Sequence, residues 1–210
     1  MNDVINSTEA FIEKNQKLII IAIIAILVLI LGIFGFNKMS QIRNEKANIA
    51  MFGAEQYFAN GNYQAALDGD TQFDGMLTVA KKYGCTKAGQ RAKFIAGICY
   101  VRTGKYSEAI SMLKKYKAKD NLTKAEATIL MGDCEAELGN TSKAITYYDK
   151  SLKMCDDFMI TPTALFKLGM LYTKDNMAKA KQYFEKIKKN YPESNESQII
   201  DKYIQLTEAE

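Results

Sequence analysis

The longest uninterrupted run of apolar residues lies near the start of the chain. Residues 18–36 read LIIIAIIAILVLILGIFGF and contain no charged residue and no side-chain amide. At ~1.5 Å per residue a helix of this length spans roughly 28 Å, close to the ~30 Å hydrocarbon core of a bilayer. A helix buried in a soluble core would carry a polar stripe, and this run has none. We therefore expect a short tail over 1–17 and a single transmembrane helix over 18–36.

A cleaved signal peptide is the alternative interpretation of this run. Such a peptide has a shorter apolar region and a small-x-small cleavage site after it, which favours an uncleaved anchor here. Basic residues flank the run on both sides, with Lys14 and Lys17 before it and Lys38, Arg43 and Lys46 after it. Because the positive-inside rule compares these flanks, the near balance leaves the orientation open.

Beyond residue 46 the pattern changes to short turns that recur along the chain. Each turn has a closing Ala, at 66, 109, 144 and 180, so the units repeat after 43, 35 and 36 residues. Three of the turns begin with Gly, a residue that suits the left-handed conformation at a helix C-terminus. A small residue precedes each turn by about seven positions, and an aromatic residue follows the small residue by three in all units but the third, which has Glu135. The residues expected to pack the repeats are Ala54, Tyr57, Ala66, Gly97, Tyr100, Ala109, Gly132, Ala144, Gly169, Tyr172 and Ala180.

This pattern resembles tetratricopeptide repeats over residues 47–192. The resemblance implies an all-α solenoid of helical hairpins, in which the small residues let the two helices approach and the aromatics fill the space between hairpins. We expect a juxtamembrane helical linker over 37–46, about four units over 47–89, 90–124, 125–161 and 162–192, and a capping helix with a tail over 193–210.

Two parts of the array depart from a plain repeat. The first unit carries about nine extra residues, and there Met76, Leu77, Val79, Ala80 and Tyr83 fit one face of an elongated second helix. After Pro192 an apolar set suits a helix that covers the open end of the stack, as repeat proteins require. Its members are Ile199, Ile200, Tyr203 and Ile204.

In this architecture the first helix of each unit lines a concave surface. Positions counted from the turns predict an apolar groove edged by charge, suited to an apolar or amphipathic peptide or partner helix. The alternative is that the same side chains pack inside the array, and the sequence leaves both open. The expected groove residues are Met51, Phe52, Phe58, Phe94, Ile98, Ile129, Leu130, Phe166 and Met170.

Composition narrows the range of chemistry. The chain has no His, so it lacks the commonest general base and metal ligand. No set of Lys, Asp and Glu forms a defensible catalytic group, and we expect no enzyme activity, no metal, no cofactor and no small-molecule substrate. The net charge of +4 is mild, and the sequence shows no basic cluster of the kind that nucleic-acid binding needs. The four Cys are expected to be mostly buried free thiols.

A short tail, one span and a repeat domain with a helical cap resemble the YfgM family, the ancillary subunit of the bacterial SecYEG translocon. The segment from Tyr83 to Ala92 resembles that family's Tyr-x-x-Ser/Thr-x-Ala-x-x-x-Ala motif. The resemblance implies a bacterial inner-membrane protein whose repeats face the periplasm and hold chaperones or foldases near SecYEG. The alternative is a cytoplasm-facing membrane scaffold that recruits soluble partners through the same groove.

Overall fold

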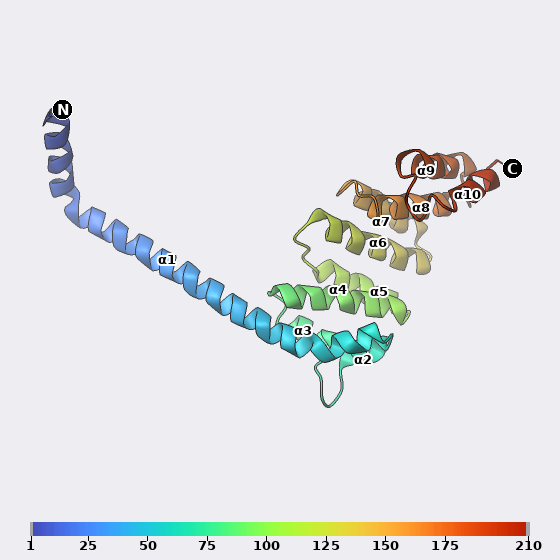
Figure 1. Cartoon of the computed structure of the whole chain (residues 1–210), viewed down its shortest axis with the longest axis horizontal. Coiled ribbons are helices and arrows are strands. Elements are labelled where there is room, and N and C mark those ends of the chain that lie inside the picture. Colours follow the sequence, from blue (N-terminus) through green and yellow to red (C-terminus); the bar gives the residue numbers. More distant parts are fainter. Residues whose placement is uncertain (1, 209–210) are drawn as a thin grey trace. The chain divides into compact units, whose positions relative to one another are not determined.

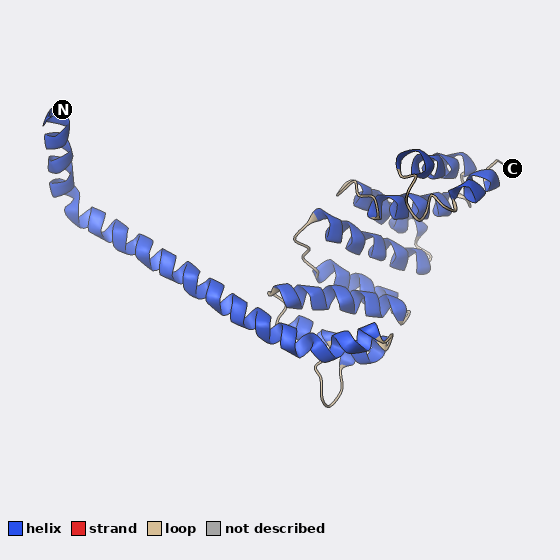
Figure 2. Cartoon of the chain, in the orientation of Figure 1, coloured by secondary structure: helices blue, strands red, loops and turns tan. Residues whose placement is uncertain are grey.

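The computed structural model describes residues 2–208, and side chains from Asn15 onward except that of Ile19. The chain divides into two compact units, one ending at Lys46 and the other beginning at Ala47. All regular secondary structure of the described residues is helical (Figure 2). The helices, labelled in Figure 1, are α1 (Asn2–Ala59), α2 (Tyr63–Asp68), α3 (Met76–Lys82), α4 (Lys87–Arg102), α5 (Tyr106–Lys115), α6 (Asn121–Glu137), α7 (Thr141–Leu152), α8 (Ile160–Tyr172), α9 (Met177–Asn190) and α10 (Ile200–Leu206).

The apolar run lies within α1. From Asn15 to Ala59 this helix is long and apolar enough to cross a membrane, with a mean hydropathy of 3.4 in its most apolar window. The described large side chains of the apolar run are exposed, with exposed fractions that range from 48% at Ile20 to 76% at Phe34. The described part of the chain thus has one helix suited to be a membrane anchor or a signal sequence.

The second unit is a stack of antiparallel hairpins. The pairs α4 and α5, α6 and α7, and α8 and α9 each form one hairpin, and consecutive hairpins pack against each other. The last part of α1 takes the place of the first helix in the first hairpin. Three turns contain a glycine with positive φ, at Gly61 (75°), Gly104 (72°) and Gly139 (77°), a conformation that a residue with a Cβ adopts at a cost.

A glycine in each later hairpin faces a large side chain of the second helix. A Cβ at Gly97 would lie 2.5 Å from Leu113 Cδ2, and a Cβ at Gly132 would lie 2.5 Å from Tyr148 Cε1. At Gly169 the nearest atom would be Phe184 Cε1 at 2.3 Å. The two helices of each hairpin are therefore closer than any side chain larger than hydrogen allows.

The extra residues of the first unit do not elongate its second helix, contrary to the expectation from the sequence. The helix stops at Asp68, and the chain forms a loop before it resumes as α3. Gly69 has φ +76°, and the Asp70 carboxylate accepts hydrogen bonds from the backbone N–H groups of Gln72 and Phe73, both at 2.8 Å. These local bonds compete with helix. Of the expected face, Met76, Val79 and Ala80 are buried and Leu77 and Tyr83 are half-buried.

The capping helix α10 closes the far end of the stack with a smaller face than expected. Ile200 is fully buried, and the Tyr203 ring lies 4.9 Å from that of Phe166. Ile199 is 51% exposed, which corrects its placement in the cap. It is the residue before the first turn of α10, so its side chain points away from the face that Ile200 and Tyr203 share.

All five hydrophobic clusters of the described residues are built from residues 47–204. The first joins α1 to α4 around Met51, Leu67 and Met76, and the last joins α8 to α10 around Phe184. The others hold the middle hairpins together. The repeat unit thus has a core of its own.

Candidate functional site

The expected groove residues separate into two rows on the first helices. One row lies three residues before the small residue of each unit and comprises Met51, Phe94, Ile129 and Phe166. Positions three apart share a helix face, so this row faces the second helix together with the small residue. The groove expectation is wrong for Met51 and Ile129, which are 0% and 5% exposed.

Three of the four aromatic members of the expected groove pack against other rings of the array. The Phe94 ring lies 5.2 Å from that of Tyr116, next to the cluster around Leu113. Phe166 lies 5.9 Å from Phe184 and contacts the capping helix. Phe58 meets Tyr63 at 5.9 Å in the first core cluster. The internal-packing alternative therefore holds for these three rings.

The second row faces outward and is mixed in character. Phe52 and Met170 are exposed, at 58% and 38%, while Ile98 and Leu130 are half-buried. Two ion pairs lie among these apolar residues, and each joins the first helix of one hairpin to the first helix of the next. Arg91 Nη2 lies 2.9 Å from Glu55 Oε1, and Lys167 Nζ lies 2.8 Å from Asp133 Oδ1. The surface is thus a mixture of apolar residues and ion pairs, whereas the sequence predicted an apolar groove edged by charge.

The repeat-packing residues lie as follows. The alanines Ala54, Ala66, Ala109, Ala144 and Ala180 are all 0% exposed, and the three helical glycines are buried. Tyr57 and Tyr100 are half-buried in the first cluster. Tyr172 stacks on Tyr183 with ring centroids 5.7 Å apart.

In the third unit a carboxylate occupies the position of these tyrosines. Glu135 is only 6% exposed. It accepts a hydrogen bond of 2.8 Å from the Asn140 side-chain amide and has Lys143 Nζ at 3.9 Å. The buried carboxylate is thereby satisfied by two groups of its own hairpin.

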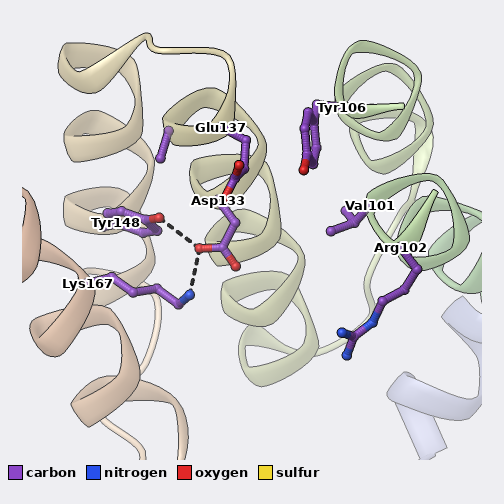
Figure 3. A pocket seen from close by; sticks show the side chains of 8 residues that line it. Val101, Arg102, Tyr106, Asp133, Glu137, Tyr148 and Lys167 are labelled. Atoms are coloured by element: carbon purple, nitrogen blue, oxygen red, sulfur yellow. Dashed lines mark hydrogen bonds and ion pairs between the residues drawn. The ribbon is translucent and has the colours of Figure 1, made fainter. Parts of the chain in front are cut away.

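A pocket of about 440 Å³ opens where the second, third and fourth hairpins meet (Figure 3). We call it the Asp133 pocket. Asp133 Oδ1 accepts a hydrogen bond of 2.7 Å from the Tyr148 hydroxyl and lies within ion-pair distance of Lys167. The pocket is lined by Val101, Arg102, Tyr106, Asp133, Ala136, Glu137, Tyr148 and Lys167.

Charge in the pocket is divided between fixed and accessible groups. Tyr148 is 3% exposed; burial, and then the charge of Asp133, raise the pKa of its hydroxyl, which therefore stays a donor. Asp133 is held by Tyr148 and Lys167, whereas Arg102 and Glu137 are exposed. A cation and an anion of the opening are thus available to a ligand with charges of both signs.

The sequence reasoning did not single out Tyr148 or Tyr106. Tyr148 follows Gly132 by sixteen positions, the same separation as from Gly97 to Leu113. The equivalent residues of the other hairpins are the apolar Leu113 and Phe184. A buried tyrosine at this position needs a hydrogen-bond partner for its hydroxyl, and that partner is Asp133. Tyr106, at the start of α5, carries no comparable signal.

The part of the chain that the structure describes contains no cluster suited to a metal ion. Within the described residues no group of three or more His, Cys, Asp or Glu is placed to hold a metal ion. Burial raises the pKa of the thiol beside the pocket, that of Cys134, to about 12, which leaves it protonated and unreactive at neutral pH.

Comparison with known proteins accounts for the hairpins. One tetratricopeptide-repeat family model matches residues 91–120 and 163–194, and a second tetratricopeptide-repeat model matches residues 125–158. The hairpins of residues 91–194 are tetratricopeptide repeats. Proteins built from these repeats are generally non-enzymatic scaffolds that bind other proteins. The chain thus carries a tetratricopeptide-repeat interaction module behind an apolar helix that suits an anchor or a signal sequence.

Solved structures show the same fold. The MamA protein is 21% identical to this chain, with a TM-score of 0.59. The match covers 78% of this chain and 81% of MamA. A kinesin light chain with TPR-like repeats from Podosopora anserina shares 12% identity over 78% of this chain and 85% of that one, also with a TM-score of 0.59. No curated protein matches the sequence.

Proposed function

We propose that the protein is a membrane-anchored interaction module that binds an extended polypeptide segment of a partner at the Asp133 pocket. The observation that supports the pocket is the division of its charges: Asp133 is tied to Tyr148 and Lys167, while Arg102 and Glu137 face solvent at its edge. A groove whose central polar groups are already fixed binds without first ordering them. Its two exposed charges then select the partner's sequence.

Site-specific photocrosslinking tests this assignment. A photoreactive amino acid is placed at Arg102 or at Glu137 in the full chain in its native membrane. As the matched control it is placed at Ser111, an exposed residue of the second helix α5. We expect a discrete protein adduct from the two pocket positions and none from Ser111. Equal adducts from all three positions would contradict a binding site at the pocket.

Charge variants separate binding from folding. Arg102→Glu and Glu137→Arg change exposed side chains for which no ion pair is found in the described chain, so we expect unchanged thermal unfolding. Each variant should weaken partner capture several-fold, because close charge pairs at interfaces couple by 1 kcal/mol or more, roughly. Unchanged capture by both variants would rule out charge recognition at this opening.

We further propose, from the resemblance to the YfgM family, that the repeats face the periplasm and act beside the SecYEG translocon. The support for this proposal is the order of the parts along the chain: a short tail, one apolar span and a capped repeat array. Protease added to intact spheroplasts tests the orientation. Digestion of residues 47–210 from outside agrees with it, whereas protection until the membrane is broken would favour the cytoplasm-facing scaffold.

A further inference from the structure

Two lysine-rich segments that are distant in the sequence lie together on one edge of the array. The first, residues 81–93, contains Lys81, Lys82, Lys87 and Lys93 and no acidic residue. It includes the end of α3, the loop that follows and the first half of α4. Its lysines are exposed, except Lys93, which is half-buried.

The second segment, residues 114–119, ends α5 and leads toward α6. It contains Lys114, Lys115, Lys117 and Lys119, all exposed, again without an acidic residue. The last-turn lysines of α3 and α5 also stabilise their helix ends. Lys117 and Lys119 lie outside helices and have no such role, so helix capping does not explain the set.

Hydrogen bonds through Gln90 join the two segments. Its side-chain amide donates to the Gly84 carbonyl, and its Oε1 accepts a hydrogen bond of 2.7 Å from the Lys117 backbone N–H. Lys93 Nζ donates to the same Gly84 carbonyl at 2.9 Å. Burial, together with the nearby charges of Lys117 and Lys115, lowers the pKa of Lys93, as expected where several cations are crowded.

This edge is where the chain from the apolar run joins the array. Arg91, near the start of α4, contacts Asn48 at 3.4 Å and Glu55 at 2.9 Å, so the start of α4 lies beside the array part of α1. The loops from α3 to α4 and from α5 to α6 lie at the edge of the stack where the array part of α1 begins (Figure 1). Only residues 37–46 separate the apolar run from Ala47, and they include Lys38, Arg43 and Lys46.

We propose that this lysine edge binds the anionic phospholipid headgroups of the membrane in which the chain is anchored. The proposal rests on the membrane anchoring proposed above. A basic edge tethered within ten residues of the bilayer meets a surface of opposite charge, and each Lys or Arg near such a surface contributes about 1 kcal/mol. The membrane thereby orients the array through charge as well as through the span.

Vesicle binding by the repeat unit tests the proposal without the anchor. The fragment 47–210 holds all the hydrophobic clusters found in the described chain. It is floated with vesicles of phosphatidylcholine alone, or with ~30% phosphatidylglycerol, at ~0.1 M salt where screening is moderate. We expect binding to the anionic vesicles only, and release at high salt. Absence of binding to anionic vesicles would overturn the proposal and leave the anchoring proposal intact.

A matched pair of charge reversals locates the binding surface. The test variant is Lys87→Glu with Lys117→Glu, one residue at a helix start and one in a loop. The control is Lys105→Glu with Lys174→Glu, which has the same change in net charge and the same two settings at the other edge. At ~1 kcal/mol per cation we expect the test variant to lose at least ~30-fold in partition and the control to change little. Equal losses would overturn the assignment to this edge.

An oligonucleotide competitor distinguishes lipid from another polyanion. Single-stranded DNA is added at the same phosphate concentration as the anionic lipid. Retained vesicle binding supports the lipid assignment. Displacement from the vesicles would show nucleic acid to be the better ligand and would overturn it.

Discussion

At the scale of single residues, a glycine of the first helix faces a large side chain of the second helix in each of the three later hairpins. Gly132 faces the ring of Tyr148, which is buried and bonded to Asp133. A ring fixed at both its face and its hydroxyl has little room to move. The glycine is therefore needed for packing.

We predict that Gly132→Ala lowers stability. The new methyl group would lie 2.5 Å from Tyr148 Cε1, and overpacking costs roughly 1–3 kcal/mol, more than the ~1 kcal/mol that Ala gains in helix propensity. Urea unfolding should show a net loss of about 1 kcal/mol. Gly53→Ala is the control: its new methyl group would meet Cγ and Cβ of Phe73, a residue that is 40% exposed on a loop, so the loop itself can shift to relieve the contact. An equal loss in both variants would mean that the Tyr148 ring is not fixed.

The thiols give a second test at this scale. Burial raises the pKa of Cys99 to about 11 and that of Cys134 to about 12. At pH 8 almost none of either is thiolate, the reactive form. We predict that a thiol-disulfide reagent modifies the exposed Cys85 quickly in the native protein and modifies Cys99 and Cys134 only after unfolding. Fast reaction of all four Cys would contradict the burial.

At the scale of elements, Asp133 links three helices, because it lies on α6 and binds Tyr148 of α7 and Lys167 of α8. We predict that Asp133→Ala lowers the free energy of unfolding by about 1–3 kcal/mol, since it leaves the buried Tyr148 hydroxyl without its acceptor. Asp133→Asn keeps an acceptor and should cost less. Adding Tyr148→Phe to Asp133→Ala should restore part of the loss, and a fully additive double variant in urea unfolding would rule out the link.

The capping helix offers two neighbouring isoleucines in opposite environments. We predict that Ile200→Ala, at a fully buried site, lowers the free energy of unfolding by about 2 kcal/mol or more. Ile199→Ala, at a site 51% exposed, should change it by less than about 0.5 kcal/mol. Thermal or urea unfolding of the two variants checks the cap, and equal effects would mean that α10 does not cover the end of the stack.

The internal position of Phe94 and Phe166 makes these two residues unsuitable for a binding test. Both rings pack against other rings of the array. Replacing them with Ala therefore lowers stability, and any loss of partner capture would follow from that loss. Arg102 and Glu137 are the suitable positions for a binding test because their side chains are exposed.

At the scale of the whole molecule, the apolar part of α1 is long enough to anchor the chain in a membrane. We predict that the full chain stays in the membrane pellet after alkaline carbonate extraction, whereas the fragment 47–210 is soluble. The intact mass of the mature protein separates an anchor from a signal sequence, because a cleaved signal would remove the apolar residues. A mature chain without residues 18–36 would contradict the anchor.

The sequence predicted the helical hairpins well because their packing depends on residues at fixed spacings. Gly97, Gly132 and Gly169 stand where the spacing placed them and face the second helices. The groove was predicted less well, because a shift of one position along a helix turns a side chain by about 100°. Ile129 and Leu130 are adjacent, yet the first is buried and the second half-buried.

The lysine edge depends on contacts between distant segments. No spacing rule pairs Gln90 with Lys117, so the lysine edge was not visible as a cluster in the sequence. The break of the first unit's second helix was missed for a local reason: Gly69 and Asp70 stabilise a loop more than the apolar pattern of residues 76–83 favours a continuous helix.

The pairing of a glycine with a large residue lies inside one hairpin in every case. Gly97 with Leu113, Gly132 with Tyr148 and Gly169 with Phe184 each need no residue from a neighbouring repeat. A duplicated segment that encodes one hairpin would carry both the glycine and the large residue that packs against it. These two residues could then change size together. Arrays of this kind can therefore lengthen or shorten by whole hairpins during evolution, with new selection needed chiefly at the joints between them.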